Sequence, residues 1–296
     1  FLGTTHTRVE IDERTFINEW ADMVSILGAP LSTPNEVAIR GIARVLRRDG
    51  QVVALSGEGA DELFGGYGLA MYAAYRHAHE PKSVSGGRFA LADASWIPVE
   101  VKGAIVNEHV LKQMQSDEVL IHEYELQYRI AQSDAGNLQP DGDEAACDVL
   151  AHMLLMQRIN LSGLLSRLDT AMMLEGVEGR TPFADIVVAM KANMLSLDEK
   201  FAPCDPGDGF GTTKRALRKA FASSLPSRVV KREKASFPLP FQEWVGEVAH
   251  VLDESKFARE MFTDAARATV TSNPREYWQL AWPMFNIALW GKRWWG

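Results

Sequence analysis

Residues 52–68 read VVALSGEGADELFGGYG, and this stretch decides the fold class. Its apolar run ends at Leu55 before Ser56-Gly57, two acidic residues flank a small pair, and two glycines follow an aromatic residue. Short unbroken apolar runs are typical of strands buried in a parallel sheet. Ligands of open parallel sheets bind beyond the carboxyl ends of the strands. The stretch therefore predicts an α/β fold in which a buried parallel strand ends at a ligand-binding turn.

The segments before this strand support the same fold class. Residues 7–11 (TRVEI) alternate in polarity like a short strand. Asp12 is a candidate N-cap for a first amphipathic helix, and a second such helix is expected near residues 35–48. The order strand, helix, helix, strand predicts an α/β unit with a crossover connection.

The rest of the chain is expected to be mostly helical. Residues 144–175 form a long apolar-rich stretch that favours a nearly unbroken helical region. Trp278, Trp282 and Phe285 recur at a spacing of three to four residues, which predicts a core-packing helix. Loops are expected in three stretches rich in Gly, Pro and polar residues, namely 81–88, 133–143 and 202–212.

Composition and charge exclude several classes of protein. The 296 residues are 46% apolar, which suffices for one or two domains with a sizeable core. A net charge of −8 without blocks of like charge argues against a nucleic-acid-binding surface. No apolar run approaches the ~18 residues of a membrane span, and no signal peptide is visible. Cys147 and Cys204 lack any C-x-x-C spacing, so the sequence predicts a reduced cytoplasmic protein.

The turn after Leu55 has residue types that suit a phosphate and a metal ion. Ser56 and Gly57 offer backbone N–H groups and close approach. Glu58 and Asp61 face one pocket if the turn enters a helix; such a carboxylate pair suits Mg²⁺ shared with a nucleotide. A carboxylate that does not bind the metal can act as a base. The alternative is that Asp61 and its neighbour only favour a helix N-terminus through the helix dipole, and the residue types leave both open.

Several long motifs resemble the synthetase domain of the asparagine synthetase family. SGEGADELFGGY at 56–67 closely resembles a signature of that family. Residues 157–185 resemble a later block that ends in E-x-R-x-P-F-x-D, and residues 214–240 resemble the next block, with K-x-x-L-R followed by R-x-K-x-x-F. GTTHTRVEI at 3–11 resembles the strand after the family's first nucleotide helix. The similarity therefore runs in the family's order along the whole chain.

This resemblance implies a fold, a domain organisation and a reaction. The fold would be a parallel-sheet PP-loop ATP-pyrophosphatase domain of the adenine nucleotide alpha-hydrolase-like kind, with a sheet-containing nucleotide-binding portion at 1–75 and a mainly helical portion at 76–296. Family members use ATP and Mg²⁺ to convert a small-molecule carboxylate into an acyl-adenylate and pyrophosphate. Ammonia, delivered from glutamine by a glutaminase domain, then gives an amide and AMP. The resemblance also allows a homodimer.

Site residues follow from the same resemblance. Asp61 matches a Mg²⁺ ligand, and Glu58 matches the carboxylate that takes a proton as ammonia adds, with metal binding as an alternative role. Lys234 matches the lysine that neutralises charge on the transferring phosphates, an electrostatic form of catalysis. Glu58 also favours amide formation with an external amine or ammonia, because the β-lactam-forming branch carries Tyr there. The remaining matches are Ser56 and Gly57, in the pyrophosphate cradle, and Arg232 and Lys214, as assisting cations.

The sequence departs from the family in ways that bear on its substrate. The S-G-G-x-D-S nucleotide loop and the cysteine nucleophile of the glutaminase domain are expected upstream of this sequence. Thr33 has no arginine near it before Arg40, and Leu164 replaces an aspartate that precedes the family's R-x-D pair. Because charged groups of a buried amino acid need partners, the alternatives to aspartate are a larger or less polar carboxylate from a natural-product or cell-wall pathway, or a peptide. A non-catalytic scaffold derived from the family is the second alternative.

Three further segments are given structural or gating roles. Glu178 and Arg180 are expected to form an ion pair that fixes the turn before the next helix, with direct substrate contact as the alternative. Arg167 and Asp169 are expected to be framework near the acyl pocket. The Gly-rich loop at 206–212 is interpreted as a mobile active-site flap, since no Lys-Ser/Thr pair follows it.

Overall fold

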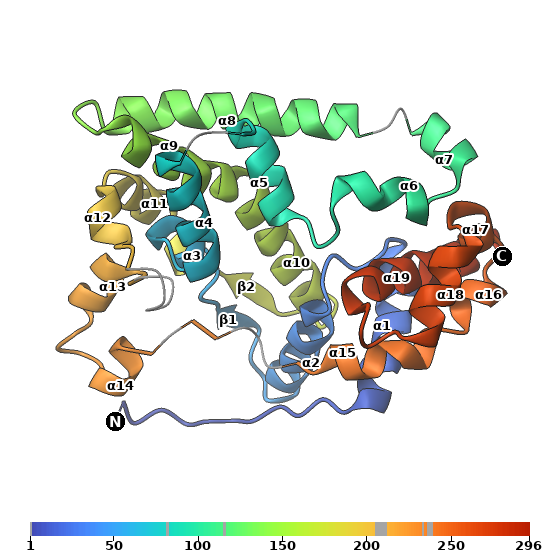
Figure 1. Cartoon of the computed structure of the whole chain (residues 1–296). Helices are drawn as coiled ribbons and strands as arrows, with labels where there is room; N and C mark the ends of the chain where they lie inside the picture. The colour runs from blue at the N-terminus through green and yellow to red at the C-terminus, as the bar shows by residue number, and fades with distance from the viewer. Residues whose placement is uncertain (1, 81–82, 115–116, 205–211, 233, 236–238) are drawn as a thin grey trace.

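The structure is a computed structural model that describes residues 2–80, 83–114, 117–204, 212–232, 234–235 and 239–296. It is mostly helical, and its described part holds one small parallel sheet (Figure 1). The predicted α/β composition with a mainly helical C-terminal portion is therefore confirmed. None of the helices in the described ranges is both long and apolar enough to cross a membrane.

The sheet pairs the predicted strand with one that the sequence did not reveal. β1 (Val53–Leu55) runs parallel to β2 (Glu178–Arg180), with Ala54 opposite Gly179. Leu55 is 74% exposed, so the prediction of a buried strand is wrong within the described residues. The reason is that β2 covers one edge of β1, while α10 packs mainly on β2. The expected ion pair is confirmed, with Arg180 Nε 2.9 Å from Glu178 Oε1.

Residues 7–11 form no strand, so that prediction is wrong. The segment is extended and mostly exposed, and Val9 and Ile11 lie against Gly41 of α2. Alternating polarity makes a strand only where a neighbouring strand accepts its backbone hydrogen bonds. In the described part of the chain, β1 pairs with β2 and not with this segment.

The first two helices agree with the predicted periodicity. α1 (Glu13–Leu27) begins as expected at Asp12, whose carboxylate accepts a hydrogen bond of 2.8 Å from the Thr15 N–H. α2 (Asn35–Arg48) matches its predicted bounds. Its buried Glu36 carboxylate turns back and accepts hydrogen bonds from the N–H groups of Ser32 and Thr33, at 2.7 and 3.0 Å. The loop before α2 is thereby fixed.

The predicted long helical region is present, and it is interrupted by one wider turn. α9 (Glu144–Met156) continues through a π-helical turn (Gln157–Leu161) into α10 (Ser162–Met173). Wide turns of this kind are frequent at functional sites. α10 also covers the sheet: a Cβ on Gly179 would come within 2.9 Å of Met172 Sδ.

Two of the predicted loops are partly helical. α8 (Glu118–Leu138) extends through 133–138, and α5 (Gly86–Ala94) begins at 86. Packing of α8 along α9 outweighs the roughly 1 kcal/mol that a helical glycine costs. Gly86 allows the close approach of α5 to α8, because a Cβ there would lie 2.0 Å from the Tyr128 ring. The shorter helices of this half are α3 (Ala60–Phe64), α4 (Gly68–His79), α6 (Lys102–Ile105), α7 (Glu108–Gln113), α11 (Ile186–Asn193), α12 (Leu197–Lys200), α13 (Arg215–Ala220) and α14 (Ser227–Val230).

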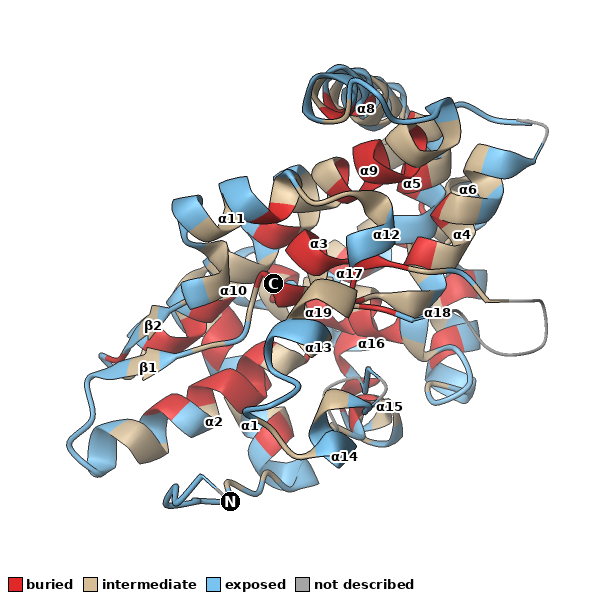
Figure 2. Cartoon of the chain, turned by 90° about the vertical axis from the view of Figure 1, so that its left-hand side faces the viewer, coloured by how far each residue is buried: buried red, intermediate tan, exposed pale blue. Residues whose placement is uncertain are grey.

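The C-terminal aromatic segment is a core helix, as predicted. In α19 (Trp278–Trp295), Trp282 is 2% exposed and stacks on Trp20 of α1 at a ring-centroid distance of 4.3 Å. The side-chain oxygen Oδ1 of Asn286 accepts hydrogen bonds from Trp20 Nε1 at 3.0 Å and from the Leu31 N–H at 3.1 Å. Figure 2 shows buried residues gathered where α1, α2, α10 and α19 meet. The helices around α19 are α15 (Phe241–Trp244), α16 (Val251–Glu254), α17 (Lys256–Met261) and α18 (Asp264–Ser272).

Candidate active site

The turn after β1 leads directly into α3. The Ser56 N–H donates to the Arg180 carbonyl at 2.7 Å, which extends the parallel pairing by one residue. Gly59 has a φ of 92° and lies close to the 3-10 turn Pro182–Ala184 that precedes α11, so that a Cβ on Gly59 would be 3.2 Å from the Ala184 nitrogen. A Cβ on exposed Gly57 would meet nothing within 4 Å. The turn is therefore constrained on its Gly59 side and open on its Gly57 side.

Two lysines from the C-terminal third converge on Asp61 in the first turn of α3. Lys234 Nζ lies 3.1 Å from Asp61 Oδ2, and Lys214 Nζ lies 2.9 Å from Asp61 Oδ1. The Asp61 side chain is 13% exposed. The structure thus brings together three of the residues that the sequence placed at the site, over a sequence separation of 173 residues for Lys234.

The backbone around this contact is unusual. Lys214 has a φ of 52°, and among the described residues it is the one non-glycine with a positive φ. Such conformations cost free energy and gather at functional sites. Gly66 makes the close contact of the two side chains feasible, since a Cβ there would lie 2.0 Å from Asp61 Oδ1 and 2.3 Å from Lys214 Cε.

Asp61 fits a magnesium ligand that is shared with a phosphate. Its Oδ1 atom is buried and has no hydrogen-bond partner among the described residues, although the Lys214 ammonium balances its charge. Mg²⁺ commonly takes one or two carboxylates from the protein and its other ligands from phosphate and water. The described residues contain no group of three or more His, Cys, Asp or Glu that would hold a metal ion by themselves. The donor set therefore suits a metal that arrives with a nucleotide.

Glu58 lies in a different environment from Asp61. Its Oε1 atom accepts a hydrogen bond of 3.0 Å from Arg167 Nη2, and Arg167 Nη1 donates to Thr33 Oγ1 at 3.0 Å. Both charged side chains are largely shielded, at 20% and 12% exposed. The sequence assigned Arg167 to the framework near the acyl pocket and missed its contact with Glu58. The R-x-D motif marks Arg167, but nothing local in the sequence joins it to residue 58.

Glu62, next to Asp61, is a buried residue that holds α3 in place through hydrogen bonds. Its carboxylate accepts hydrogen bonds from Tyr67 Oη at 2.6 Å and Asn160 Nδ2 at 3.1 Å, and it is 2% exposed. Burial, with the neighbouring Glu62 carboxylate, raises the pKa of Tyr67. Lys234 Nζ lies 5.5 Å from the centroid of the Tyr67 ring. The helix-dipole interpretation therefore does not describe Glu62, which fixes α3 against the π-helical turn.

A cavity of about 290 Å³ lies beside the lysines and contains the remaining predicted cation, Arg232, in its wall together with Lys214 and Lys234. Arg218, which the sequence analysis missed, holds this segment: its guanidinium donates to the carbonyls of Val230 and, at 3.0 Å, Arg232. The Gly-rich flap predicted at 206–212 falls almost entirely outside the described residues. Its flanks meet where the Ala202 N–H donates to the Thr212 carbonyl at 3.0 Å.

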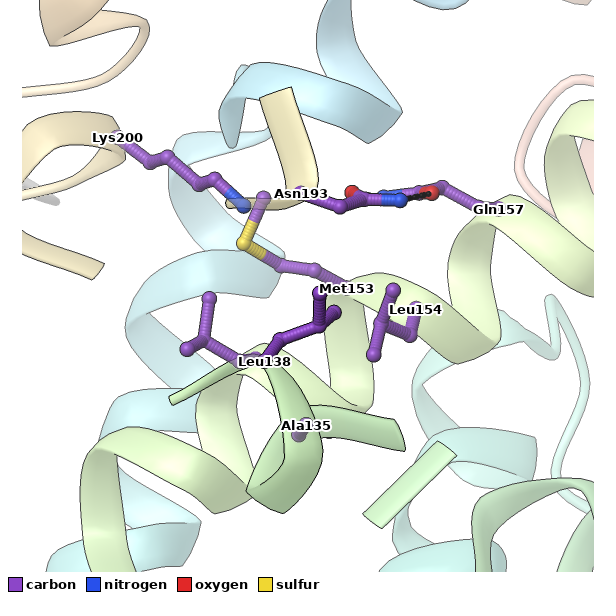
Figure 3. A pocket seen from close by; sticks show the side chains of 8 residues that line it. Ala135, Leu138, Met153, Leu154, Gln157, Asn193 and Lys200 are labelled. Carbon is purple, nitrogen blue, oxygen red and sulfur yellow. Dashed lines mark hydrogen bonds between the residues drawn. The ribbon is translucent and has the colours of Figure 1, made fainter. Parts of the chain in front are cut away.

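A separate buried space surrounds Lys200 of α12 (Figure 3). Lys200 is 1% exposed, and the end of its side chain points toward Met153. Gln157 and Asn193 border the same space and exchange two hydrogen bonds of 2.9 Å. Burial lowers the pKa of Lys200 to about 8. The sequence contained no signal for this buried lysine.

A third cavity, of about 240 Å³, lies against Arg167. Leu164 lines it, at the position that the sequence marked as a departure from the family. Thr33 lines it as well, but Arg40 does not: its guanidinium pairs with Glu19, Asp22 and Glu175.

Comparison with known proteins agrees with the motifs. A model of the family described as asparagine synthase matches residues 1–292. A putative glutamine-hydrolyzing asparagine synthetase of Mycobacterium tuberculosis H37Rv is 28% identical over 274 residues, covering 82% of this chain and 38% of the relative. Asparagine synthetase 1 of Bacillus subtilis 168 is 25% identical over 322 residues, covering 97% of this chain and 48% of the relative. The chain thus spans less than half the length of these relatives.

Proposed function

Because the chain belongs to the asparagine synthase family, we propose that it is the synthetase part of an enzyme that forms an amide from a carboxylate and ammonia at the cost of ATP. The observation that carries the proposal is the contact of Lys214 and Lys234 with Asp61 at the carboxyl end of β1. A magnesium-bound pyrophosphate leaving group needs a carboxylate ligand for the metal and cations near its oxygens. Here Asp61 Oδ1 is the carboxylate oxygen, which has no hydrogen-bond partner among the described residues, and the two lysines are the cations.

The proposed fold is that of a PP-loop ATP-pyrophosphatase, with its nucleotide-binding portion in residues 1–75. Ser56 and Gly57 provide the open side of the turn for the phosphates, and Asp61 is the residue that would hold Mg²⁺. The metal, when bound, supplies positive charge at the oxygens of the leaving pyrophosphate. Lys214 and Lys234 add to that charge, and Arg232 borders the same cavity.

Glu58 is proposed to serve the second half of the reaction. When ammonia adds to an acyl-adenylate, the nitrogen carries an extra proton that a carboxylate can accept. Arg167 pairs with Glu58, whereas Lys214 and Lys234 pair with Asp61, so the proposed base and the proposed metal ligand have separate partners. The nitrogen donor is proposed to be ammonia released from glutamine by a glutaminase domain.

The test uses the full-length protein with magnesium and ATP, a panel of carboxylic acids, and either glutamine or ammonium chloride. Pyrophosphate, AMP and amide are measured in parallel. We expect acid-dependent pyrophosphate release and a matching amount of amide. Glu58→Gln should lower amide formation by about 10²- to 10⁴-fold, the range for loss of a general base. Glu276→Gln removes an exposed carboxylate in the C-terminal region and is the control.

The two assays separate the steps. Adenylation without amide in Glu58→Gln supports the role of Glu58 after pyrophosphate release. If no acid in the panel releases pyrophosphate, the chain is a scaffold derived from the family and the proposal is refuted.

A further inference from the structure

The cavity beside Arg167 is lined mainly by apolar side chains. Ala90 and Ala94 come from α5, Tyr124 from α8, Ile159 from the π-helical turn, and Leu164 from α10. Its volume of about 240 Å³ is below the roughly 300–1,000 Å³ of drug-sized ligand sites, so it suits a small molecule. Arg167 forms the charged end of this cavity and contacts Glu58 of the phosphate turn.

Arg167 has a donor that the described residues leave unused. Its two terminal nitrogens donate to Glu58 and Thr33, whereas Nε is buried and has no hydrogen-bond partner in the described part of the chain. A buried donor without an acceptor costs free energy, so native structures rarely contain one unless a ligand or water completes it. Arginine pairs well with the oxygens of carboxylates and phosphates. Because Arg167 lines the cavity and the proposed reaction needs a carboxylate, the unused Nε–H is assigned to that carboxylate.

The lining of this cavity contains no acid for an α-ammonium group. Among its described lining residues there is no Asp or Glu, Leu164 presents an apolar side chain, and Glu58, which contacts the lining residue Arg167, is already paired with that guanidinium. Glu36, the nearest acid in sequence to the lining residues Ser32 and Thr33, is occupied by their N–H groups. A cation buried without an anionic partner is strongly disfavoured. An amino acid such as aspartate would leave its ammonium in that situation.

We propose that the acyl substrate of this site is a small monocarboxylate with an apolar body and without an α-ammonium group. Its carboxylate accepts from Arg167 Nε, next to Glu58, and its apolar body lies against Leu164 and Ile159. The assignment rests on the proposed amide-forming function and adds the substrate class to it.

The first experiment compares hexanoate, phenylacetate and L-aspartate on the full-length protein. Binding of each acid is measured by titration calorimetry, and pyrophosphate release is measured with magnesium and ATP. Hexanoate or phenylacetate should bind at least about tenfold more tightly than aspartate, with a negative heat-capacity change that marks apolar burial. The same acid should be preferred for pyrophosphate release.

Two variants locate the binding site. Leu164→Asp should weaken hexanoate binding at least about tenfold, because it places a charge against the apolar body. Ser166→Asp adds the same charge on the exposed side of α10 and should leave binding unchanged. Arg167→Lys keeps a cation beside Glu58 but removes the Nε donor, so it should weaken every acid that binds.

The outcomes distinguish this inference from the proposed function. If aspartate binds more tightly than the apolar acids and releases pyrophosphate, the function stands and the substrate class is wrong. If apolar acids bind in the expected way and none releases pyrophosphate, the function fails and the bound acid is not an acyl substrate. Equal binding by the parent and Leu164→Asp refutes the assignment of this cavity.

Discussion

Replacement of Lys234 by methionine tests the contact on which the proposed function rests. The substitution keeps the length and apolar stem of the side chain and removes only the ammonium that lies 3.1 Å from Asp61 Oδ2. Lys214→Met is the companion variant, since its ammonium contacts the other oxygen of the same carboxylate. If both cations neutralise a leaving pyrophosphate, both variants should release it slowly.

The magnitude follows from distance and exposure. A cation about 4 Å from a unit negative charge gains about 4 kcal/mol at an effective dielectric constant of about 20. The Lys234 side chain is 42% exposed, and solvent screens an exposed charge. We therefore halve its interaction energy to about 2 kcal/mol, which corresponds to roughly a 30-fold loss of rate. The Lys214 side chain is 24% exposed, which leaves about 3 kcal/mol, or roughly a 150-fold loss.

The assay is continuous pyrophosphate release by the full-length protein at saturating acid and ATP. Lys231→Met is the control, because Lys231 is an exposed lysine on the same segment. Partly exposed ion pairs contribute about 0–1 kcal/mol to stability, so urea unfolding should be nearly unchanged in all three variants. A rate within twofold of the parent for Lys234→Met, with the fold intact, would refute the reasoning.

Three further predictions concern the same fold. Gly66→Ala should lower the rate of pyrophosphate release at least about tenfold with little loss of stability. The new Cβ would lie 2.0 Å from Asp61 Oδ1, so the flexible Asp61 side chain must move away. The rate of release and the urea midpoint of the variant are compared with those of the parent. Asn286→Leu should lower the free energy of unfolding, measured by urea denaturation, by about 2–4 kcal/mol. The substitution leaves the buried Trp20 Nε1–H and the backbone N–H and carbonyl of Leu31 without their hydrogen-bond partner. Burial lowers the pKa of Lys200 from 10.5 to about 8, so between these pH values the unfolded state binds more protons and stability rises with pH. Lys200→Met should abolish that slope and add on the order of 3 kcal/mol at pH 7; a slope that persists in the variant contradicts the assignment.

The elements that could be predicted from sequence are those with a strong local period. α1 buries one face over several turns, and α2 and α9 bury runs of neighbouring residues, so the helical character of these segments is readable without tertiary information. β2 is only three residues long and two of these are charged, so its existence depends on β1 and not on its own sequence. The glycines of α5 read as loop signals because the close packing against α8 that requires them is a long-range contact, whereas Gly136 of α8 has open space around it.

In the candidate site, too, the part that lies in one local motif could be predicted from the sequence and the long-range contacts could not. Ser56, Gly57, Glu58 and Asp61 lie in one continuous motif, and the turn that carries them has the predicted position. The pairing of Glu58 with Arg167 spans 109 residues and depends on how α10 passes the end of β1. Spacing in the sequence contains no information about such a crossing, so the arginine could be noticed but its partner could not.

The aromatic C-terminal helix is connected to Arg167 through a chain of hydrogen bonds. Asn286 of α19 clamps Leu31 through hydrogen bonds to both its N–H and its carbonyl. Leu31 precedes the loop residues that Glu36 fixes, and Thr33 in that loop accepts from Arg167. The orientation of the Arg167 guanidinium is therefore determined from both ends, by Glu58 and by a loop anchored to the core. A guanidinium held this firmly can keep Nε aimed at one position, which is what selection between acids of similar size requires.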